Sequence, residues 1–287
     1  MVSYGLVVSE FICLTLLWMA AILTCILIFR REPLKVFFTR SPTLFIIFGI
    51  ICVLAVIYFL FLVLWLLYIS EAIGSLAFVG NVAIILGIAT SCVETAYDIF
   101  TVVLFIQRLA ILLAPTRSRK RLDQLLYTLA TFLAIVPFVY FGYLYRGIID
   151  FTVRPTAGEC RTVGCSEPLK QDRSALDICF VVSTANVVTG AAFVALLLRR
   201  KSVPGLQAKK INQITRYLFF FRLTLVVIPL IFDIFFSMQT NVTISYYIGP
   251  FGMMGASLEE SLFVFVYFVV FRPQTKIVNV SSSRQTS

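Results

Sequence analysis

The feature that most constrains this chain is a series of apolar stretches, each long enough to cross a lipid bilayer as a helix. A spanning helix needs about 20 apolar residues, because the hydrocarbon layer is about 30 Å thick and each helical residue rises about 1.5 Å. The sequence therefore predicts an all-α membrane protein, a seven-transmembrane helix bundle in a single domain over residues 1–273. The seven predicted helices cover residues 6–29, 42–69, 83–113, 125–145, 175–198, 217–238 and 246–271.

Composition supports the same fold class. Hydrophobic residues make up 60% of the chain and charged residues 13%, whereas about 25% charged residues is usual in soluble domains. The first apolar stretch has no basic residues ahead of it and is too long for the core of a secretory signal, so we expect it to remain as the first helix. Residues 274–287 form a short polar tail.

Basic residues are distributed unequally between the two sides of the predicted bundle. They follow helices one, three and five and occur in the tail, whereas the N-terminus and the loops after helices two and six contain none. Because cytoplasmic loops carry an excess of Lys and Arg, we expect the N-terminus outside and the C-terminus in the cytoplasm. The net charge of +10 then reflects topology and indicates no nucleic-acid partner.

Three residues on the predicted outer side are candidates for modification. Cys160 and Cys165 lie in the loop after helix four, where an oxidising compartment could join them to each other, or join one of them to another outer cysteine. Asn241 begins an Asn-Val-Thr glycosylation sequon after helix six. The other cysteines fall within or at the edge of apolar stretches and read as small buried side chains.

Enzyme functions lack the residues that they usually require. The chain contains no histidine, which removes His-clustered metal sites and His-dependent nucleophilic catalysis. It also has no phosphate-binding glycine loop and no Cys-x-x-Cys pair. We therefore expect a protein that is not an enzyme and that holds no cofactor and no metal.

Charged residues inside the third predicted helix indicate a functional interior, because a charge in hydrocarbon is costly and usually faces a bundle interior or a wet cavity. Glu94, Asp98, Thr101, Phe105 and Arg108 follow one another at intervals of three or four residues, which puts them on one helical face. At helical rise, Asp98 lies about 15 Å and Glu94 about 21 Å from Arg108. One end of this face is placed to meet a ligand and the other to meet a cytoplasmic partner.

Helices six and seven add further charges to the predicted interior. The ligand-binding candidates are led by Glu94 and comprise, with it, Asp98, Asp233, Glu259 and Glu260. The adjacent Glu259 and Glu260 point about 100° apart, so at most one is expected to face the cavity centre. Acids outnumber bases, so either several carboxyls are protonated or the cavity favours a cation or a hydrogen-bond donor. Arg222 on helix six could hold a carboxylate of helix seven.

Several short motifs resemble those of G-protein-coupled receptors. Residues 106–110, Ile-Gln-Arg-Leu-Ala, followed by Pro115, resemble the end of helix three in that family, where the pattern is acid, arginine, aromatic. The change to Gln107 and Leu109 is similar to nematode serpentine chemoreceptors. Further segments similar to serpentine receptor class BC are residues 160–165, 230–233, 249–250 and 258–260.

The resemblance implies a chemosensory receptor of the plasma membrane, with sensory cilia as one location. Such a receptor binds a small extracellular molecule within the bundle and activates a heterotrimeric G protein. Gln107, Arg108, Arg222 and Pro229 would then serve coupling and activation, with Pro229 as a hinge. Membrane lipid and a second receptor copy would be further partners. Helix seven has no Asn-Pro-x-x-Tyr motif, so the rhodopsin-type switch is not carried over.

The alternative function is a small ion- or proton-coupled transporter or a channel, because acids within a membrane also build cation and proton pathways. The sequence shows no internal repeat between its halves and no glycine-broken helices at matching positions. These features would have favoured a transporter.

Overall fold

A computed structural model describes residues 4–31, 33–70, 77–114, 120–147, 149, 151–152, 174–200, 205–240 and 251–271. Within these ranges the regular structure consists of helices, without a strand. In chain order they are α1 (Tyr4–Arg31), α2 (Leu34–Arg40), α3 (Pro42–Ile69), α4 (Ala77–Leu113), α5 (Lys120–Tyr145), α7 (Ser174–Arg199), α8 (Leu206–Arg222), η2 (Leu223–Val227), α9 (Ile228–Thr240) and α11 (Phe251–Val270).

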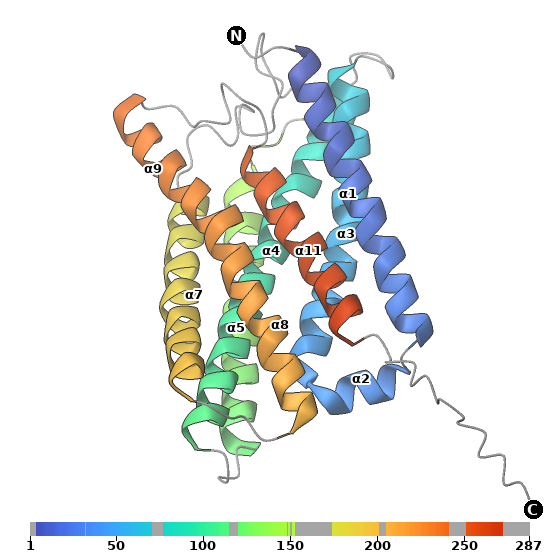
Figure 1. The fold of residues 1–287 in the computed structure, drawn as a ribbon. Helices are drawn as coiled ribbons and strands as arrows, with labels where there is room; N and C mark the ends of the chain where they lie inside the picture. Colours follow the sequence, from blue (N-terminus) through green and yellow to red (C-terminus); the bar gives the residue numbers. More distant parts are fainter. Residues whose placement is uncertain are drawn as a thin grey trace, which may run out of the picture.

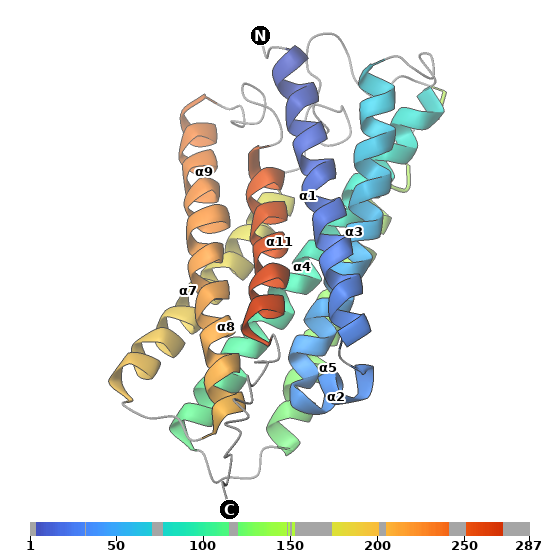
Figure 2. The ribbon, with the colours of Figure 1, turned by 45° about the vertical axis from the view of Figure 1, so that its right-hand side comes forward.

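Seven helical spans are long and apolar enough to cross a membrane. Each corresponds to one of α1, α3, α4, α5, α7 and α11, and the remaining one is the continuous run of α8, η2 and α9. Figures 1 and 2 show these spans running side by side, with α1 beginning at one end of the bundle and α11 ending towards the other. The prediction of an all-helical chain with seven apolar spans is confirmed.

Three predicted helix starts differ from the structure by at least five residues. Helix α4 begins at Ala77 where the sequence predicted residue 83, α5 at Lys120 where it predicted 125, and α8 at Leu206 where it predicted 217. Hydropathy places a boundary where the apolar run ends, but a helix continues through polar residues as long as its backbone bonds are satisfied. For the last helix, residues 246–250 lie outside the described residues, and α11 is described from Phe251.

A short helix that the sequence analysis did not predict, α2, lies at the end of the bundle where α1 finishes (Figure 1). Its Phe37 is fully buried, with ring centroids 5.1 Å from Phe48 and 5.0 Å from Tyr267. Ser41 then occupies the N-cap position of α3, and Pro42 is the first helical residue, where a missing N–H costs nothing. Helix α2 thus closes this end of the core with an aromatic anchor.

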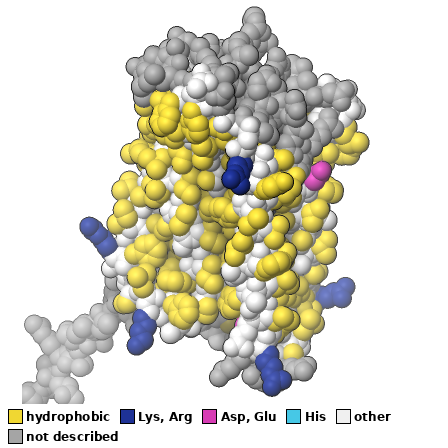
Figure 3. All heavy atoms as spheres, turned by 180° about the vertical axis from the view of Figure 1, so that it is seen from behind, with side chains coloured by type: hydrophobic (Ala, Val, Ile, Leu, Met, Phe, Trp, Pro, Cys, Tyr) yellow, Lys and Arg dark blue, Asp and Glu magenta, His cyan; other side chains and the backbone are white. Residues whose placement is uncertain are grey.

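Most basic residues of the described chain lie towards the α2 end. A broad apolar belt covers the bundle, and most of the dark-blue side chains lie towards one end of it (Figure 3). In the described parts, the basic residues at or near the helix ends on this side are Arg30, Arg31, Lys35, Arg121, Arg199, Arg200, Lys209, Lys210 and Arg216. Arg146, at the far end of α5, lies on the opposite side.

Helix α4 is the central element of the bundle and packs against α3, α5 and α7. In its most apolar stretch 61% of the residues are buried, against 17% in α5. Helix α5 instead directs large apolar side chains outward, with Phe132 65% and Val139 66% exposed. The helix that carries the predicted charged face is therefore the one most enclosed by protein.

The sixth span contains an irregular turn, because the π-helical segment η2 separates α8 from α9. Pro229 follows two residues after η2 and supplies no N–H for the usual bond to the Leu225 carbonyl four residues earlier. Gly255 of α11 lies directly against this carbonyl, since a Cβ at that position would sit 2.0 Å from the Leu225 oxygen. The missing side chain allows α11 and the sixth span to approach closely here.

Candidate functional site

A cavity of about 160 Å³ lies between α4, α7, α11 and the sixth span. All five acids predicted as ligand-binding residues line it, and so do two of the residues predicted to serve activation. These lining residues are Glu94, Asp98, Asp233, Glu259, Glu260, Arg222 and Pro229. The fold therefore brings side chains from helices three, six and seven into one site.

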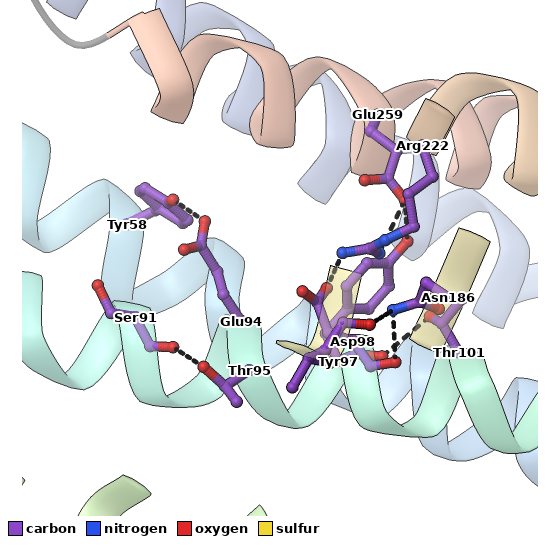
Figure 4. Close-up of polar contacts among 11 residues, drawn as sticks. Tyr58, Ser91, Glu94, Thr95, Tyr97, Asp98, Thr101, Asn186, Arg222 and Glu259 are labelled. Atoms are coloured by element: carbon purple, nitrogen blue, oxygen red, sulfur yellow. Dashed lines mark hydrogen bonds and ion pairs between the residues drawn. The ribbon is translucent and has the colours of Figure 1, made fainter. Parts of the chain in front are cut away.

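Arg222 ties three spans together at this cavity. Its guanidinium donates hydrogen bonds to Asp98 of α4 and, at 3.3 Å, to Glu259 of α11. The hydroxyl of Tyr97 donates to Glu259 at 3.0 Å, and the Arg222 guanidinium carbon lies 5.4 Å from the Tyr97 ring centroid. Figure 4 shows these side chains converging from α4, α8 and α11. Arg222, predicted as part of the activation machinery, thus belongs to the same cluster as the acids.

The fifth span, α7, is also joined to this cluster, because one of its side chains binds the backbone of Asp98. The amide nitrogen of Asn186 on α7 donates to the Asp98 carbonyl oxygen at 3.2 Å (Figure 4). Asn186 is 1% exposed. Its hydrogen bond fixes α7 against α4 at the level of the ion pairs, which satisfies polar groups that hydrocarbon would leave unpaired.

On its other side the cavity is bounded by Glu94 and Glu260. Tyr58 of α3 donates its hydroxyl hydrogen to Glu94 (Figure 4). Trp18 of α1 stacks on Tyr58 with ring centroids 4.8 Å apart, and its indole N–H donates to Ser257 of α11 at 3.0 Å. The Tyr58 ring thus positions Glu94 through a hydrogen bond, and the Trp18 ring packs on the Tyr58 ring. These contacts connect α1 and α3 to the site.

Both adjacent glutamates of α11 line the cavity, although the sequence predicted that at most one would face its centre. They do so in different ways. Glu259 is bound by Arg222 and Tyr97, whereas Glu260 is 1% exposed and its Oε2 has no hydrogen-bond partner among the described residues. Neighbouring helical positions can both border a cavity when it spreads across more than one face of the helix.

A second polar cluster lies at the α2 end and contains the two remaining activation candidates. The Gln107 side chain donates to Asp123 of α5 at 3.0 Å and accepts from Thr43 of α3. The Thr43 hydroxyl is also 2.8 Å from that of Tyr127. This Gln107 cluster joins α3, α4 and α5 through hydrogen bonds.

Arg108 is 7% exposed and its guanidinium donates to the hydroxyl of Ser41 at 3.2 Å. That hydroxyl makes no capping bond to the first turn of α3, although Ser41 holds the N-cap position. Arg108 therefore lies inside the bundle near its basic end, with a hydroxyl among its partners. We include it and Ser41 in the Gln107 cluster from here on.

Several residues of both clusters were not predicted from the sequence. Tyr58, Tyr97 and Trp18 belong to apolar stretches where aromatic residues are common. The sequence therefore does not distinguish those whose O–H or N–H makes a buried hydrogen bond from those that only pack. Asn186 is a polar residue within a predicted span, which is a signal that the sequence offered. Asp123 precedes the predicted start of the fourth helix and gave no such signal. Predicted residues Cys160, Cys165 and Asn241, and the tail from 274, lie outside the described residues.

Among the described residues, no three His, Cys, Asp or Glu side chains are grouped so that they could hold a metal ion. Comparisons with protein-family models, with curated proteins and with solved structures give no match for this chain. Its function is therefore argued from the sequence and from the geometry of the two clusters.

Proposed function

We propose that this chain is a chemosensory G-protein-coupled receptor, which binds a small extracellular molecule in the cavity and activates a heterotrimeric G protein at the α2 end. One observation carries the proposal: α4 holds Asp98 in the cavity wall and, ten residues further on, buries Arg108 in the second cluster. These positions are about 15 Å apart along the helix. A single rigid element thus contacts both sites.

The proposal places the basic α2 end in the cytoplasm and the chain in the plasma membrane, since cytoplasmic loops carry the excess of Lys and Arg. The motifs in helices three to seven support a place close to nematode serpentine receptor class BC. Sensory cilia, a second receptor copy and lipid at the inner leaflet belong to the same proposal.

The sixth span is suited to transmit the signal. Arg222 holds its middle to α4 and α11, and the irregular turn of η2 with Pro229 follows immediately. A ligand that changes the contacts of Asp98 or Glu259 also changes their ion pairs with Arg222, which attach the sixth span to α4 and α11. From Arg222, α8 extends to the α2 end of the bundle. The ligand then shifts the population towards a conformation in which α8 moves and opens a crevice beside Arg108.

Replacement of Arg108 tests this function. Arg108→Ala is expected to abolish ligand-evoked signalling, because the G protein loses its contact in the opened crevice, while surface expression stays intact. The measurement is a second-messenger response to a panel of odorants in cells that express the receptor. Arg30→Ala, which removes an exposed arginine from the same end of the bundle, is the matched control and should signal normally. Normal signalling by Arg108→Ala would remove this residue from the mechanism.

Transport of a cation is the alternative that the acidic cavity also suits. An apolar cluster argues against an open path in this conformation, because Phe105, Phe193 and Phe219 are buried next to each other beyond Asp98. The ring centroids of Phe193 and Phe219 each lie 6.2 Å from that of Phe105. Ligand-independent current or uptake in a heterologous cell, without G-protein activation, would favour the transporter.

A further inference from the structure

Among the described residues, the acids of the cavity outnumber its bases. Five carboxyl side chains line its wall, those of Glu94, Asp98, Asp233, Glu259 and Glu260, together with one arginine, Arg222. Asp233 makes a contact of its own. Arg222 directs its terminal nitrogens to Asp98 and Glu259. The remaining pair, Glu94 and Glu260, has no basic partner within salt-bridge distance in the described part of the chain.

The hydrogen bonding of Glu260 is a further indication that a donor binds in this cavity. Glu260 is 1% exposed, lines the cavity, and its Oε2 has no hydrogen-bond partner among the described residues. Glu94 lines the same cavity from α4. A buried carboxyl without a partner is costly, and a donor that enters the cavity would relieve this cost.

The rest of the wall limits the size and the character of this donor. Besides the acids, the cavity is lined by apolar side chains that include Val226, Leu230, Met253 and Ala256. Its volume is about 160 Å³, and an apolar cavity of about 150 Å³ admits a benzene-sized molecule. A bare inorganic cation would leave the apolar wall without contacts. A small ring or branched chain that carries one positive group matches both parts of the wall.

We propose that the molecule bound in this cavity is a small primary amine in its ammonium form, with the nitrogen between Glu94 and Glu260 and the hydrocarbon against the sixth span and α11. This inference rests on the proposed function and specifies the chemical class of its ligand. An ammonium group has three N–H donors. Glu260 Oε2 accepts one, and Glu94, which already accepts from Tyr58, has a second oxygen for another.

The test compares three compounds with the same six-membered ring, cyclohexylamine, cyclohexanol and cyclohexanecarboxylate. The full chain is held in zwitterionic lipid nanodiscs, and its thermal unfolding is measured at increasing concentrations of each compound, because a ligand that binds the folded state raises Tm. We expect the amine to raise Tm, and the neutral and anionic compounds to leave it unchanged. A rise with cyclohexanol equal to that with cyclohexylamine would overturn the inference, as would no rise with any of them.

Glu260→Gln keeps the shape of the side chain and removes its charge, and should weaken amine binding at least tenfold. Glu10→Gln is the matched control, since Glu10 is another acid of a spanning helix with an unpartnered Oε2 but lies outside the cavity wall. It should bind the amine as the unaltered chain does. Unchanged binding by Glu260→Gln would overturn the inference. The comparison of compounds on the unaltered chain remains decisive where a variant fails to fold.

Nucleotide exchange on a heterotrimeric G protein separates this inference from the proposed function. If cyclohexylamine binds in a Glu260-dependent way and no G protein responds, the result supports the amine site and contradicts the receptor function. If a neutral odorant drives exchange while the amine neither binds nor competes, the receptor function stands and the amine site falls.

Discussion

The cavity and the Gln107 cluster are both polar and buried, but they are held together differently. At the cavity, Arg222 binds two carboxylates from two other helices. At the α2 end the described contacts are single hydrogen bonds, from Thr43 to Gln107, from Gln107 to the Asp123 carboxylate and from Arg108 to Ser41. Removing one partner of a buried ion pair costs about 3–5 kcal/mol, whereas a hydrogen bond contributes about 1 kcal/mol, or about 1.5–3 kcal/mol when one partner is charged. The contacts at the cavity are therefore the stronger ones, and under the proposed function the Gln107 cluster is the one that exchanges partners.

The largest effect is expected from Arg222→Ala. It leaves Asp98 and Glu259 as uncompensated buried charges, so the free energy of unfolding should fall by about 3–5 kcal/mol. Thermal unfolding of the purified chain in nanodiscs measures the loss. Arg146→Ala, at an exposed arginine that directly follows α5, should change stability little. If the two variants unfold at the same temperature, the ion pairs do not hold the bundle as described.

The next effect is expected from Gly255→Ala, at the contact between α11 and the sixth span. Its Cβ would lie 2.0 Å from the Leu225 carbonyl oxygen, so α11 and the sixth span must separate, at a cost of about 1–3 kcal/mol. Gly49→Ala is the control, because nothing lies within 4 Å of its added Cβ. That variant should be neutral or slightly stabilising in the same unfolding assay. Equal stability of both variants would contradict the close approach at Gly255.

A smaller loss is expected from Thr43→Val in the Gln107 cluster. The change keeps the shape and removes the hydroxyl that contacts Gln107 and Tyr127, so about 1 kcal/mol should be lost. Basal G-protein activation should rise at the same time, because fewer bonds hold the closed α2 end. Thr39→Val, at an exposed hydroxyl of α2, should alter neither quantity. A loss as large as that of Arg222→Ala would show that the two clusters are equally rigid.

The smallest effect, and of opposite sign, is expected from Asn212→Leu on α8. Asn212 is 3% exposed, and both atoms of its amide lack partners among the described residues. Leucine of similar size removes an unsatisfied polar group, so the free energy of unfolding should rise by up to about 1 kcal/mol. Asn186→Leu should do the reverse, since that amide binds the Asp98 carbonyl. A lower melting temperature for Asn212→Leu would mean that its amide is satisfied in the folded chain.

The sequence predicts the spans well where hydropathy and local chemistry agree. The second span begins at Pro42 and ends at Ile69, as predicted, because a serine and a proline precede a long apolar run and Ser70 follows it. The start of α8 was missed because Lys209 and Lys210 continue the helix beyond the apolar stretch. Local composition reports the apolar part of a helix, not the point where its hydrogen bonds end.

The sequence predicted the charged members of the candidate site and one of its pairs, because Arg222 was expected to hold a carboxylate of helix seven and binds Glu259 there. Helical spacing along α4 placed Asp98 on one face with Glu94 and Arg108, and charge inside a span singled out Arg222. Periodicity within one helix does not reveal which helix lies beside it in space. The double contact of Arg222, and the support of Glu94 by Tyr58, therefore required the structure.

The hydroxyl of Ser41 has two competing uses. It stands at the N-cap position of α3, where a serine side chain usually satisfies one of the first backbone N–H groups and adds about 1 kcal/mol to helix stability. In the resting arrangement it accepts from Arg108 instead. In the proposed activation, Arg108 turns towards a G protein, and the Ser41 hydroxyl then becomes available to cap the first turn of α3. The Ser41 hydroxyl then exchanges its hydrogen bond from Arg108 for one from a backbone N–H of α3. This exchange makes the movement of Arg108 less costly than the loss of that hydrogen bond without replacement.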